Sequence, residues 1–479
     1  MHPISPGRSV MWLLPLLLLM ADPIGAPAQL EIYFNRSVDT SLAWPAGNAA
    51  RGGSDFSAIT LQELNAAKSS IDMAMYSLNT PRVVNALVAA RARGVKVRVI
   101  AHVENLSDST NRFGDLAQAG IPIITNPKAA PGEIQPLMHD KFFVIDARSA
   151  APHDAHPVVI TGSWNATQQQ TYLDANNLVI VRDSAVAHAY LVEFQEMWGS
   201  AADTPDTVAA RFGRAKRNNT EHFFTLADGS RLELRFSPTD STSRAINGHL
   251  AACGSSILTA NLTFTYALFA RTLRDRAANG VNVRSIIDNV DDAGSQFGFL
   301  GTFAEAYDWQ LDGLLHHKYA VLDALPFGHG SGARVITGSH NWTSSAETRN
   351  DENMIAITDS LAANQYLQEF AARYRDVGGT TPFVSASAVS DGGRRTPSGA
   401  AGLRAYPNPF TGTVTLVPGT PANGALVITD NLGQALLVTN VADGTHTVEW
   451  NAEAYPAGIY HVALRHDGRT EHLKLTIVR

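Results

Sequence analysis

The sequence contains a single cysteine, Cys253, so no disulfide can form within the chain. A lone thiol can serve as a nucleophile, but Cys253 lies in the stretch HLAACGSSI, which has an apolar, helix-like pattern. Cysteine in such a setting behaves as a small hydrophobic residue. We therefore expect Cys253 to belong to the core.

Positive charge is also scarce. The chain has 37 Lys and Arg against 44 Asp and Glu, which gives a net charge of −7. Tight, non-specific binding of nucleic acid needs clustered Lys and Arg, so that class of function is disfavoured, although nucleic acid as a substrate is not excluded. Because 45% of the residues are hydrophobic, the bulk of the chain is expected to be globular, with two or three domains.

Long apolar runs are absent beyond the N-terminus. The run from Val10 to Ala21 follows Arg8 and is too short to span a membrane. The sequence Ala-Pro-Ala at 26–28 then places small residues where signal peptidase cleaves. Since polar flanks and a cleavage site occur together, residues 1–28 are predicted to be a secretory signal peptide rather than a buried helix.

An internal repeat determines the expected fold. Residues 69–105 and 255–291 align without a gap, and each reads as a strand, a helix of period near 3.6, a glycine and a Val-rich strand. Gly94 and Gly280 stand where the helices should end. The repeat predicts two homologous α/β units, residues 29–207 and 208–377, with mixed sheets packed about a pseudo-twofold axis.

The composition changes after this region. Residues 378–403 are rich in Gly, Ser, Thr and Pro, as in a linker. Residues 404–479 contain short alternating strands separated by Gly, Asn and Asp turns. This pattern predicts a small all-β sandwich.

Two motifs interrupt otherwise apolar strands. LMHDKFFVID (137–146) and LLHHKYAVLD (314–323) both contain His-x-Lys-x4-Asp. Alternate residues of a strand share a face, so His139 projects with Lys141, as His316 does with Lys318. The motif aspartates lie on the opposite face and are expected to anchor the structure rather than to act as acids; they are Asp146 and Asp323.

The residue types in these motifs suit phosphate chemistry. Lysine stabilises a phosphoryl oxygen, and one histidine can attack phosphorus while the other protonates the leaving alcohol and then activates water. Each motif is followed by G-S-x-N, whose side chains can donate to the non-bridging oxygens. These candidate substrate-binding residues are Ser163, Asn165, Ser339 and Asn341. A single such motif is weak evidence, but two copies within an independent repeat are strong evidence.

Two other interpretations concern histidine and tryptophan. His153 with His156, or His316 with His317, form a candidate metal pair, but no carboxylate or cysteine set completes it, so neither metal nor cofactor is expected. Trp164 and Trp342, beside the G-S-x-N motifs, suit either a substrate cleft or the core.

Residues 29–377 resemble the phospholipase D superfamily, on the strength of HDKFFVID with GSWN, HHKYAVLD with GSHN, and the context AMYSLNTPRVVNALVAARARGVKVRVI. The resemblance implies a covalent phosphohistidine intermediate and no metal requirement. It also implies that His139 and His316 are the nucleophile and the acid/base pair. The groups that it assigns to the phosphate are Lys141, Lys318, Asn165 and Asn341.

The superfamily also has a glutamate after G-S-x-N that orients a histidine, and Glu352 in RNDENMIAI matches it. The equivalent residue of the first unit is Asn176, with Asp174 as a candidate substitute. The superfamily's usual order makes His139 the nucleophile. However, a carboxylate raises the basicity of a histidine, so Glu352 paired with the second-unit His316 equally suits a nucleophile there.

The C-terminal region resembles the sorting domain of the type IX secretion system, through YPNPF, DNLGQ, AGIYHVAL and KLTIVR. This implies export across the outer membrane, with the secretion machinery as partner and release or surface anchoring as the outcome. The alternative is an immunoglobulin-like module that binds substrate or a surface.

Together these features predict a secreted, metal-independent phosphodiesterase, a phospholipase D that cleaves the distal phosphodiester bond of a phospholipid. One alternative is an endonuclease that acts on DNA or RNA. Another is an inactive surface-binding protein, against which the two complete motifs argue. The protein is expected to be a monomer with an internal pseudo-dimer.

Overall fold

A computed structural model describes residues 29–148, 157–326, 332–383, 403–406, 408, 410–417, 424–430, 435–441, 447–466 and 469–478. The chain forms two compact units, Met1–Asp391 and Gly392–Arg479. The predicted signal peptide, most of the predicted linker, and the histidines at 153 and 156 lie outside the described residues.

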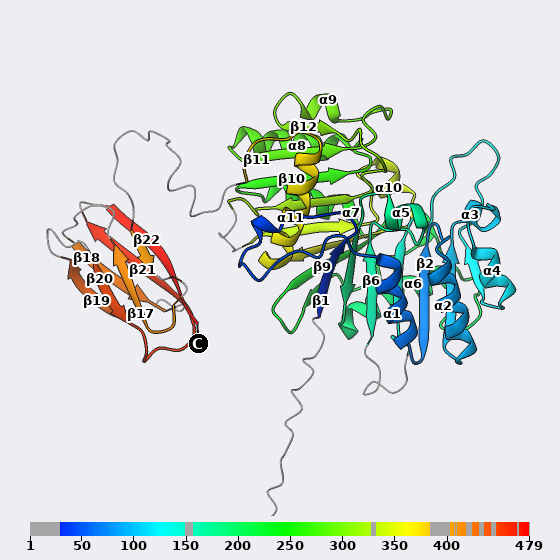
Figure 1. Ribbon diagram of the computed structural model, residues 1–479, viewed down its shortest axis with the longest axis horizontal. Coiled ribbons are helices and arrows are strands. Elements are labelled where there is room, and N and C mark those ends of the chain that lie inside the picture. The colour runs from blue at the N-terminus through cyan, green and yellow to red at the C-terminus, as the bar shows by residue number, and fades with distance from the viewer. Residues whose placement is uncertain are drawn as a thin grey trace, which may run out of the picture. The chain divides into compact units, whose positions relative to one another are not determined.

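The first half of the N-terminal unit is a seven-stranded sheet of order β1-β7-β6-β5-β2-β3-β4 (Figure 1). Strands β2, β3 and β4 run parallel to one another, and the other pairs are antiparallel. The strands are β1 (Leu30–Phe34), β2 (Ser70–Met75), β3 (Lys96–Ala101), β4 (Ile123–Thr125), β5 (Lys141–Ile145), β6 (Val158–Gly162) and β7 (Asn177–Val181).

The second half repeats this arrangement in an eight-stranded sheet of order β12-β11-β10-β13-β14-β15-β9-β8. Here β10, β11 and β12 are the parallel strands. The strands are β8 (Phe223–Thr225), β9 (Arg231–Ser237), β10 (Ser256–Asn261), β11 (Asn282–Ile287), β12 (Glu305–Asp308), β13 (Lys318–Leu322), β14 (Arg334–Gly338) and β15 (Glu352–Thr358). The predicted pair of homologous mixed sheets is thus confirmed.

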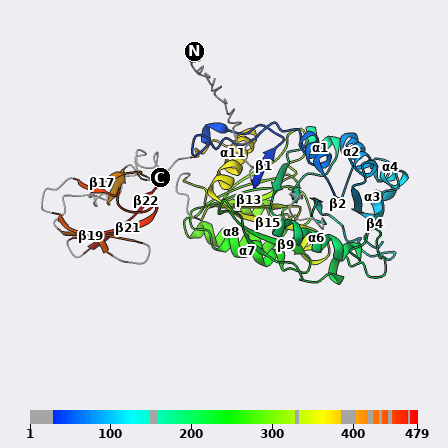
Figure 2. The same ribbon diagram turned by 90° about the horizontal axis from the view of Figure 1, so that it is seen from below.

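Helices cover both faces of each sheet, as Figures 1 and 2 show: α1 and α2 lie opposite α6 on the first, and α7 and α8 lie opposite α11 on the second. Their bounds are α1 (Phe56–Ala66), α2 (Pro81–Ala92), α6 (Ser184–Trp198), α7 (Thr242–Ala251), α8 (Ala267–Ala278) and α11 (Ser360–Asp376). The short helices are α3 (Val103–Ser107), α4 (Phe113–Gln118), α5 (Gln168–Tyr172), α9 (Phe297–Leu300), α10 (Ser344–Thr348), η1 (Thr40–Leu42) and η2 (Gly213–Ala215).

Burial follows the helical period. Helix α2 buries Val83, Val84, Leu87 and Ala90, one stripe of a 3.6-residue repeat, against the outer face of the first sheet. Gly94 follows α2 with a φ of 91°, a left-handed conformation that glycine adopts at helix ends, as the sequence predicted. Cys253 is fully buried in the outer core of the second half.

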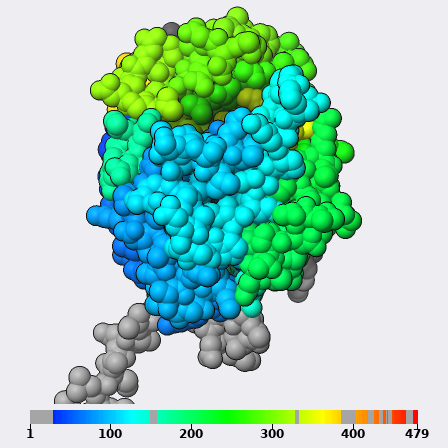
Figure 3. Space-filling view, turned by 90° about the vertical axis from the view of Figure 1, so that its right-hand side faces the viewer, coloured from blue at the N-terminus to red at the C-terminus, as the bar shows by residue number. Residues whose placement is uncertain are grey.

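A central core joins the two halves. Helices α6 and α11 pack there together with strands of both sheets. Matching hydrogen bonds cross the interface, because the Tyr366 hydroxyl donates to Asn177 Oδ1 at 3.1 Å and Asn353 Nδ2 donates to the Tyr190 hydroxyl at 3.1 Å. Figure 3 shows the first half, in blue and cyan, in broad contact with the green second half. The two sheets are therefore related by a pseudo-twofold axis.

The C-terminal unit is all β. It has a three-stranded sheet, β16-β17-β20, and a four-stranded sheet, β19-β18-β21-β22, both antiparallel, whose inner faces share one apolar core. The strands are β16 (Arg404–Tyr406), β17 (Thr413–Val417), β18 (Gly424–Thr429), β19 (Ala435–Val441), β20 (Val448–Asn451), β21 (Gly458–His466) and β22 (Arg469–Ile477). Within the described ranges, no helix has the length and apolarity needed to cross a membrane.

Candidate active site

The two His-Lys motifs meet because the chain segments before them cross between the halves. Met138 forms a parallel bridge with Asp351, just before β15, and Leu315 forms one with Ala175, just before β7. The His139 amide donates to the Asp351 carbonyl at 2.8 Å. Each motif therefore begins beside the last strand of the other half.

His139 is held by a carboxylate from the second half. Its Nδ1 lies 2.9 Å from Oε2 of the fully buried Glu352, which also accepts from Asn350 Nδ2 at 3.0 Å. Burial raises the pKa of the Glu352 carboxyl, but the charge and hydrogen bond of His139, together with the nearby His340 and Lys141, lower it to about 2. Since an ionised carboxylate only accepts, Nδ1 carries the proton and Nε2 keeps its lone pair.

His316 is held by a neutral amide from the first half. Its Nδ1 lies 2.9 Å from Asn176 Oδ1. That oxygen also accepts from the Ser163 hydroxyl at 2.9 Å, while Asn176 Nδ2 donates to the Gln170 carbonyl at 3.2 Å. The amide is thus fixed with its oxygen toward the histidine, so His316 is oriented without a compensating charge.

This crossed pairing differs from the expectation that Glu352 orients His316. The expected substitute Asp174 contacts neither histidine, because its Oδ1 accepts from the Leu314 amide at 3.0 Å. The bridges between the halves explain why each histidine is oriented by a residue of the other half, because the start of each half's last strand lies beside the other half's motif.

The two lysines concentrate positive charge in the site. Lys141 Nζ donates to the His139 carbonyl at 2.7 Å, and Lys318 Nζ donates to the His316 carbonyl at 2.8 Å. Burial lowers the pKa of Lys141 to about 7, and burial together with the nearby Lys141 lowers the pKa of Lys318 well below its ordinary value. An anion bound here would relieve both effects.

The histidine pKa values shift in the same direction. Burial and Lys141 lower the pKa of His139 to about 4, although Glu352 opposes the shift. Burial, then Lys318 and Lys141, lower the pKa of His316 well below its ordinary value. Burial and the lysines therefore favour the neutral form of both imidazoles.

The G-S-x-N residues divide into two kinds. Asn165 is buried and Asn341 is half-buried, and the Oδ1 atom of each is shielded from solvent with no hydrogen-bond partner among the described residues. The Ser163 hydroxyl differs from the expected phosphate donor, because it donates to Asn176 Oδ1 at 2.9 Å, whereas the Ser339 hydroxyl accepts from the Asn353 amide at 3.0 Å and keeps its own proton to donate. Both hydroxyls thus bond the neighbouring strand.

The glycine of each G-S-x-N motif is required because the neighbouring strand, β7 or β15, approaches its backbone closely. Gly162 and Gly338 have φ values of 138° and 132°. A Cβ atom on Gly162 would lie 2.4 Å from the Asn177 carbonyl oxygen, and one on Gly338 would lie 2.3 Å from that of Asn353. Only glycine permits this approach.

The motif aspartates bind backbone amides away from the histidines. Asp146 accepts from the amides of Lys68, Ser69 and Ser70 at 2.7 to 3.1 Å, which fastens the end of β5 to the turn before β2. Asp323 accepts from the Gly254 and Ser255 amides, both at 2.8 Å, in the second half.

The tryptophans beside G-S-x-N belong to the core. Trp164 packs edge-on against Phe56 in the outer core of the first half, and Trp342 does so against Phe264 and Phe269 in that of the second. His317 is buried, with its Nε2 3.0 Å from Glu369 Oε1. Across the part of the chain that the structure describes, no three His, Cys, Asp or Glu side chains gather as a metal site would require.

Tyr76 is a site residue that the motif analysis missed. Its ring centroid lies 4.9 Å from that of His139 and 5.5 Å from Lys141 Nζ, and it stacks on His102 at 5.2 Å. The available signal was its place directly after β2, where side chains meet at the carboxyl end of parallel strands.

Comparison with known proteins agrees with this geometry. A family model described as cardiolipin synthase, PLD-like domain matches residues 60–198 and 246–374, more than half of the chain. A model described as secretion system C-terminal sorting domain matches residues 404–478, which indicates export by type IX secretion to the cell surface or extracellular space.

Individual curated relatives match about a third of the chain. A mitochondrial cardiolipin hydrolase of Xenopus tropicalis is 30% identical over 145 residues, 30% of this chain and 61% of that protein. A phospholipase D of Rickettsia prowazekii (strain Madrid E) is 30% identical over 148 residues, 31% of this chain and 63% of that protein. This chain thus spans less than two thirds of the length of either relative.

Among solved structures, a phospholipase D family member, Nuc, of Salmonella typhimurium has 24% identity and a TM-score of 0.27, covering 37% of this chain and 98% of that one. The family model, by contrast, matches the chain twice, once around each His-Lys motif. The chain therefore belongs to the phospholipase D-like family, as two tandem copies of its domain followed by a secretion sorting domain.

Proposed function

We propose that this protein is an exported phosphodiesterase that hydrolyses phospholipids by a phospholipase D reaction. The observation that carries the proposal is the crossed pair of contacts, His139 with Glu352 and His316 with Asn176. It gives two neutral histidines, each with Nδ1 engaged and Nε2 available, beside two lysines.

The difference between the two contacts supports His139 as the nucleophile. When Nε2 attacks phosphorus, the imidazole becomes a positively charged phosphoimidazolium, and the Glu352 carboxylate beside Nδ1 stabilises that charge. The P–O bond to the leaving alcohol breaks in the same step. His139 is available for attack above pH 4, because its pKa is about 4.

His316 suits the acid/base role. Burial and the lysines lower its pKa, but an anionic phosphate bound beside the lysines raises it again, so His316 is protonated at Nε2 when substrate is bound and transfers that proton to the leaving oxygen. The resulting neutral imidazole then takes a proton from water, whose oxygen attacks phosphorus and breaks the P–N bond to His139. The proton that His316 gives to the leaving alcohol in the first step is thus regained from water in the second step.

The lysines and asparagines would hold the phosphate. Lys141 and Lys318 supply positive charge, and the amides of Asn165 and Asn341 lie beside the motifs as further donors. The chemistry described needs no further group, since the charge that develops on the phosphate oxygens is balanced by lysine.

Phospholipid is the favoured substrate because the relatives that match about a third of the chain are named for cardiolipin and phospholipid cleavage. Cleavage of nucleic acid by the same two-step chemistry is the alternative. The sorting domain makes the type IX secretion machinery the expected transport partner. Export to the cell surface or medium would place the site in contact with external lipids.

A parallel assay tests the proposal. Purified protein is incubated with phosphatidylcholine vesicles, diphosphatidylglycerol vesicles and single-stranded DNA, each with and without a primary alcohol. Release of the head group, and transfer of the phosphatidyl group to the alcohol, are the expected results, because any nucleophile that enters the site can attack the phosphohistidine. Cleavage of DNA without lipid turnover would favour the nuclease, and His139→Ala serves as the control for contaminating activity.

A further inference from the structure

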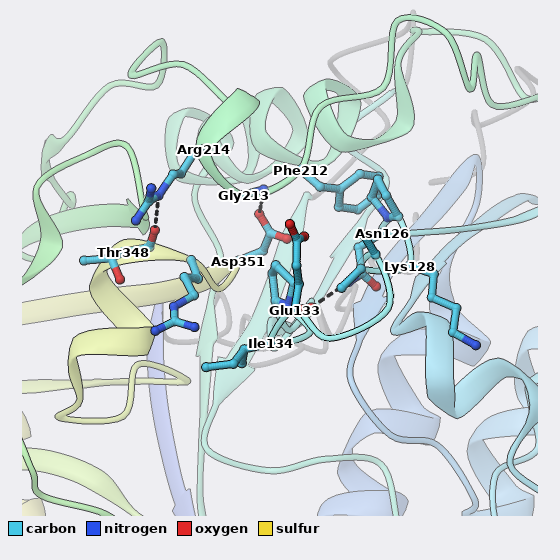
Figure 4. A pocket seen from close by; sticks show the side chains of 14 residues that line it. Asn126, Lys128, Glu133, Ile134, Phe212, Gly213, Arg214, Thr348 and Asp351 are labelled. Carbon is cyan, nitrogen blue, oxygen red and sulfur yellow. Dashed lines mark hydrogen bonds between the residues drawn. The ribbon is translucent and has the colours of Figure 1, made fainter. Parts of the chain in front are cut away.

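A cavity of about 590 Å³ lies beside the active site (Figure 4). Three separate segments line it: residues 126–136 of the first half, 212–214 of the segment that connects the halves, and 348–351 of the second half. The cavity thus lies where both halves and the segment that connects them meet.

The cavity shares its wall with the catalytic residues. Asp351 lines it, and the Asp351 carbonyl accepts from the His139 amide at 2.8 Å. Pro136 also lines it, three residues before His139. At roughly 3.3 Å per residue of extended chain, the wall formed by Pro136 lies within about 10 Å of His139 along the backbone.

Three basic and two acidic residues line the cavity. Arg214 and Arg349 both line the cavity, and no carboxylate pairs with either guanidinium in the part of the chain described. Arg214 Nε donates to the Thr348 carbonyl at 2.7 Å, which fixes the plane of the guanidinium, as the dashed line in Figure 4 shows. Lys128 adds a third cation at the edge.

The two acids of the lining, Asp351 and Glu133, differ in how they offset this charge. Asp351 is buried; its Oδ1 accepts from the Gly213 amide at 2.6 Å and lies 3.2 Å from Lys216 Nζ, so its charge is already neutralised. Glu133 is the remaining carboxylate of the lining, and it stands on the exposed loop.

The pseudo-twofold axis provides an internal comparison. Arg349 and Leu173 occupy equivalent places in the two halves, because each precedes the residue that orients a histidine, Glu352 or Asn176, by the same number of positions. At these equivalent places the second half has Thr348 and Arg349, whereas the first half has Tyr172 and Leu173, which are 58% and 49% exposed. The cavity arginine Arg349 therefore has leucine as its counterpart in the first half.

We propose that this cavity is a second anion subsite, which binds a phosphate of the substrate other than the one being cleaved. The proposal rests on the proposed phosphodiesterase function and specifies its substrate class: molecules with two phosphates a short distance apart. Guanidinium groups bind phosphate oxygens in pairs, and two of them face one cavity here. Two kinds of molecule carry phosphates at such a separation: a lipid that has two phosphates, and an oligonucleotide.

The kinetic test compares substrates with one and two phosphates. The values of kcat/KM are measured for bis-p-nitrophenyl phosphate, for diphosphatidylglycerol and for a short single-stranded oligonucleotide. Arg349→Gln should lower kcat/KM about tenfold for whichever of the two polyanions is the substrate, and leave bis-p-nitrophenyl phosphate unchanged. Glu133→Gln should raise it for the same polyanion. Arg271→Gln removes an exposed charge outside the cavity and should change neither.

A binding test keeps the subsite separate from the chemistry. In the His139→Asn variant, which lacks the nucleophile, 1,3-propanediol bisphosphate should bind more tightly than propyl phosphate, and Arg349→Gln should remove the difference. Equal affinities, or a difference that survives Arg349→Gln, would overturn the proposal. If the difference is found but no phosphodiester is cleaved by the unmodified protein, the subsite stands and the proposed function fails.

Discussion

The Glu352 carboxylate lies 2.9 Å from Nδ1 of His139, although the two residues belong to opposite halves of the repeat. The equivalent contact, from Asn176 to His316, has the same length and no charge. Two histidines that a repeat would make equivalent are thus distinguished by one side chain each, and the chemistry assigned to them follows from that difference.

Removing the negative charge beside His139 and adding one beside His316 should have different effects, the first on nucleophilic attack and the second on protonation of the leaving group. Glu352→Gln keeps an oxygen for His139 Nδ1 but removes the negative charge, so formation of the phosphoenzyme should slow by about 10²-fold. Asn176→Asp places a carboxylate on His316, raises its pKa and weakens it as an acid. Its defect should be large for alkyl leaving groups and small for p-nitrophenol, which needs no protonation. Rapid-quench kinetics with both substrates measures this; equal defects of Asn176→Asp on both would contradict the assignment.

Anion binding should weaken above neutral pH. The pKa of Lys141 is lowered by burial to about 7, so its ammonium is charged below pH 7 and becomes neutral above it. The inhibition constant of tungstate, a phosphate mimic, should therefore rise as the pH increases from 7 to 9. Lys141→Met should bind tungstate weakly and with a smaller change over that range. A constant affinity up to pH 9 in the unmodified protein would show that Lys141 stays charged.

The motif aspartates should matter for stability rather than for turnover. Asp146→Asn replaces a carboxylate that accepts from three backbone amides, so the free energy of unfolding should fall by about 1–3 kcal/mol. The kcat of the remaining folded protein should change little. Denaturant unfolding and kcat are measured for this variant and for Asp291→Asn, an exposed control. A loss of kcat by orders of magnitude at full stability would instead make Asp146 catalytic.

Removal of the C-terminal unit should separate export from catalysis. The cut belongs after Asp391, where the compact N-terminal unit ends, because Phe383 packs into the central core and Arg284 donates to the carbonyls of Thr381 and Pro382. A chain that ends at 391 should remain inside the cell and keep its kcat when purified. Loss of kcat in the folded, truncated protein would give the C-terminal unit a role beyond sorting.

The sequence predicted the parts of the site that depend on local geometry. Strand alternation placed His139 with Lys141 and His316 with Lys318, and the repeat predicted two similar sheets. It did not predict which half orients which histidine, because Glu352 reaches His139 only through the Met138–Asp351 bridge between the halves. Contacts of this kind join residues that are distant in the chain, and no local period records them.

The roles of the two G-S-x-N serines also could not be predicted from the sequence. A hydroxyl beside a phosphate motif is chemically suited to bind phosphate, but the Ser163 hydroxyl donates to Asn176 Oδ1, and the Ser339 hydroxyl accepts from the Asn353 amide. Their role depends on how closely the next strand approaches, which Gly162 permits. That distance is a property of the folded sheet, so the residue type alone did not reveal it.

The central claim is that His139 forms the covalent intermediate, and trapping that intermediate tests it most directly. The His316→Ala variant is mixed with bis-p-nitrophenyl phosphate, quenched at alkaline pH, where phosphohistidine survives, and digested for mass spectrometry. The account predicts a burst of nitrophenol and a phosphorylated peptide modified at His139. The unmodified protein should carry the same modification transiently, and His139→Ala should show neither burst nor adduct. A phosphate found on His316 of the unmodified protein, with none on His139, would contradict the assignment.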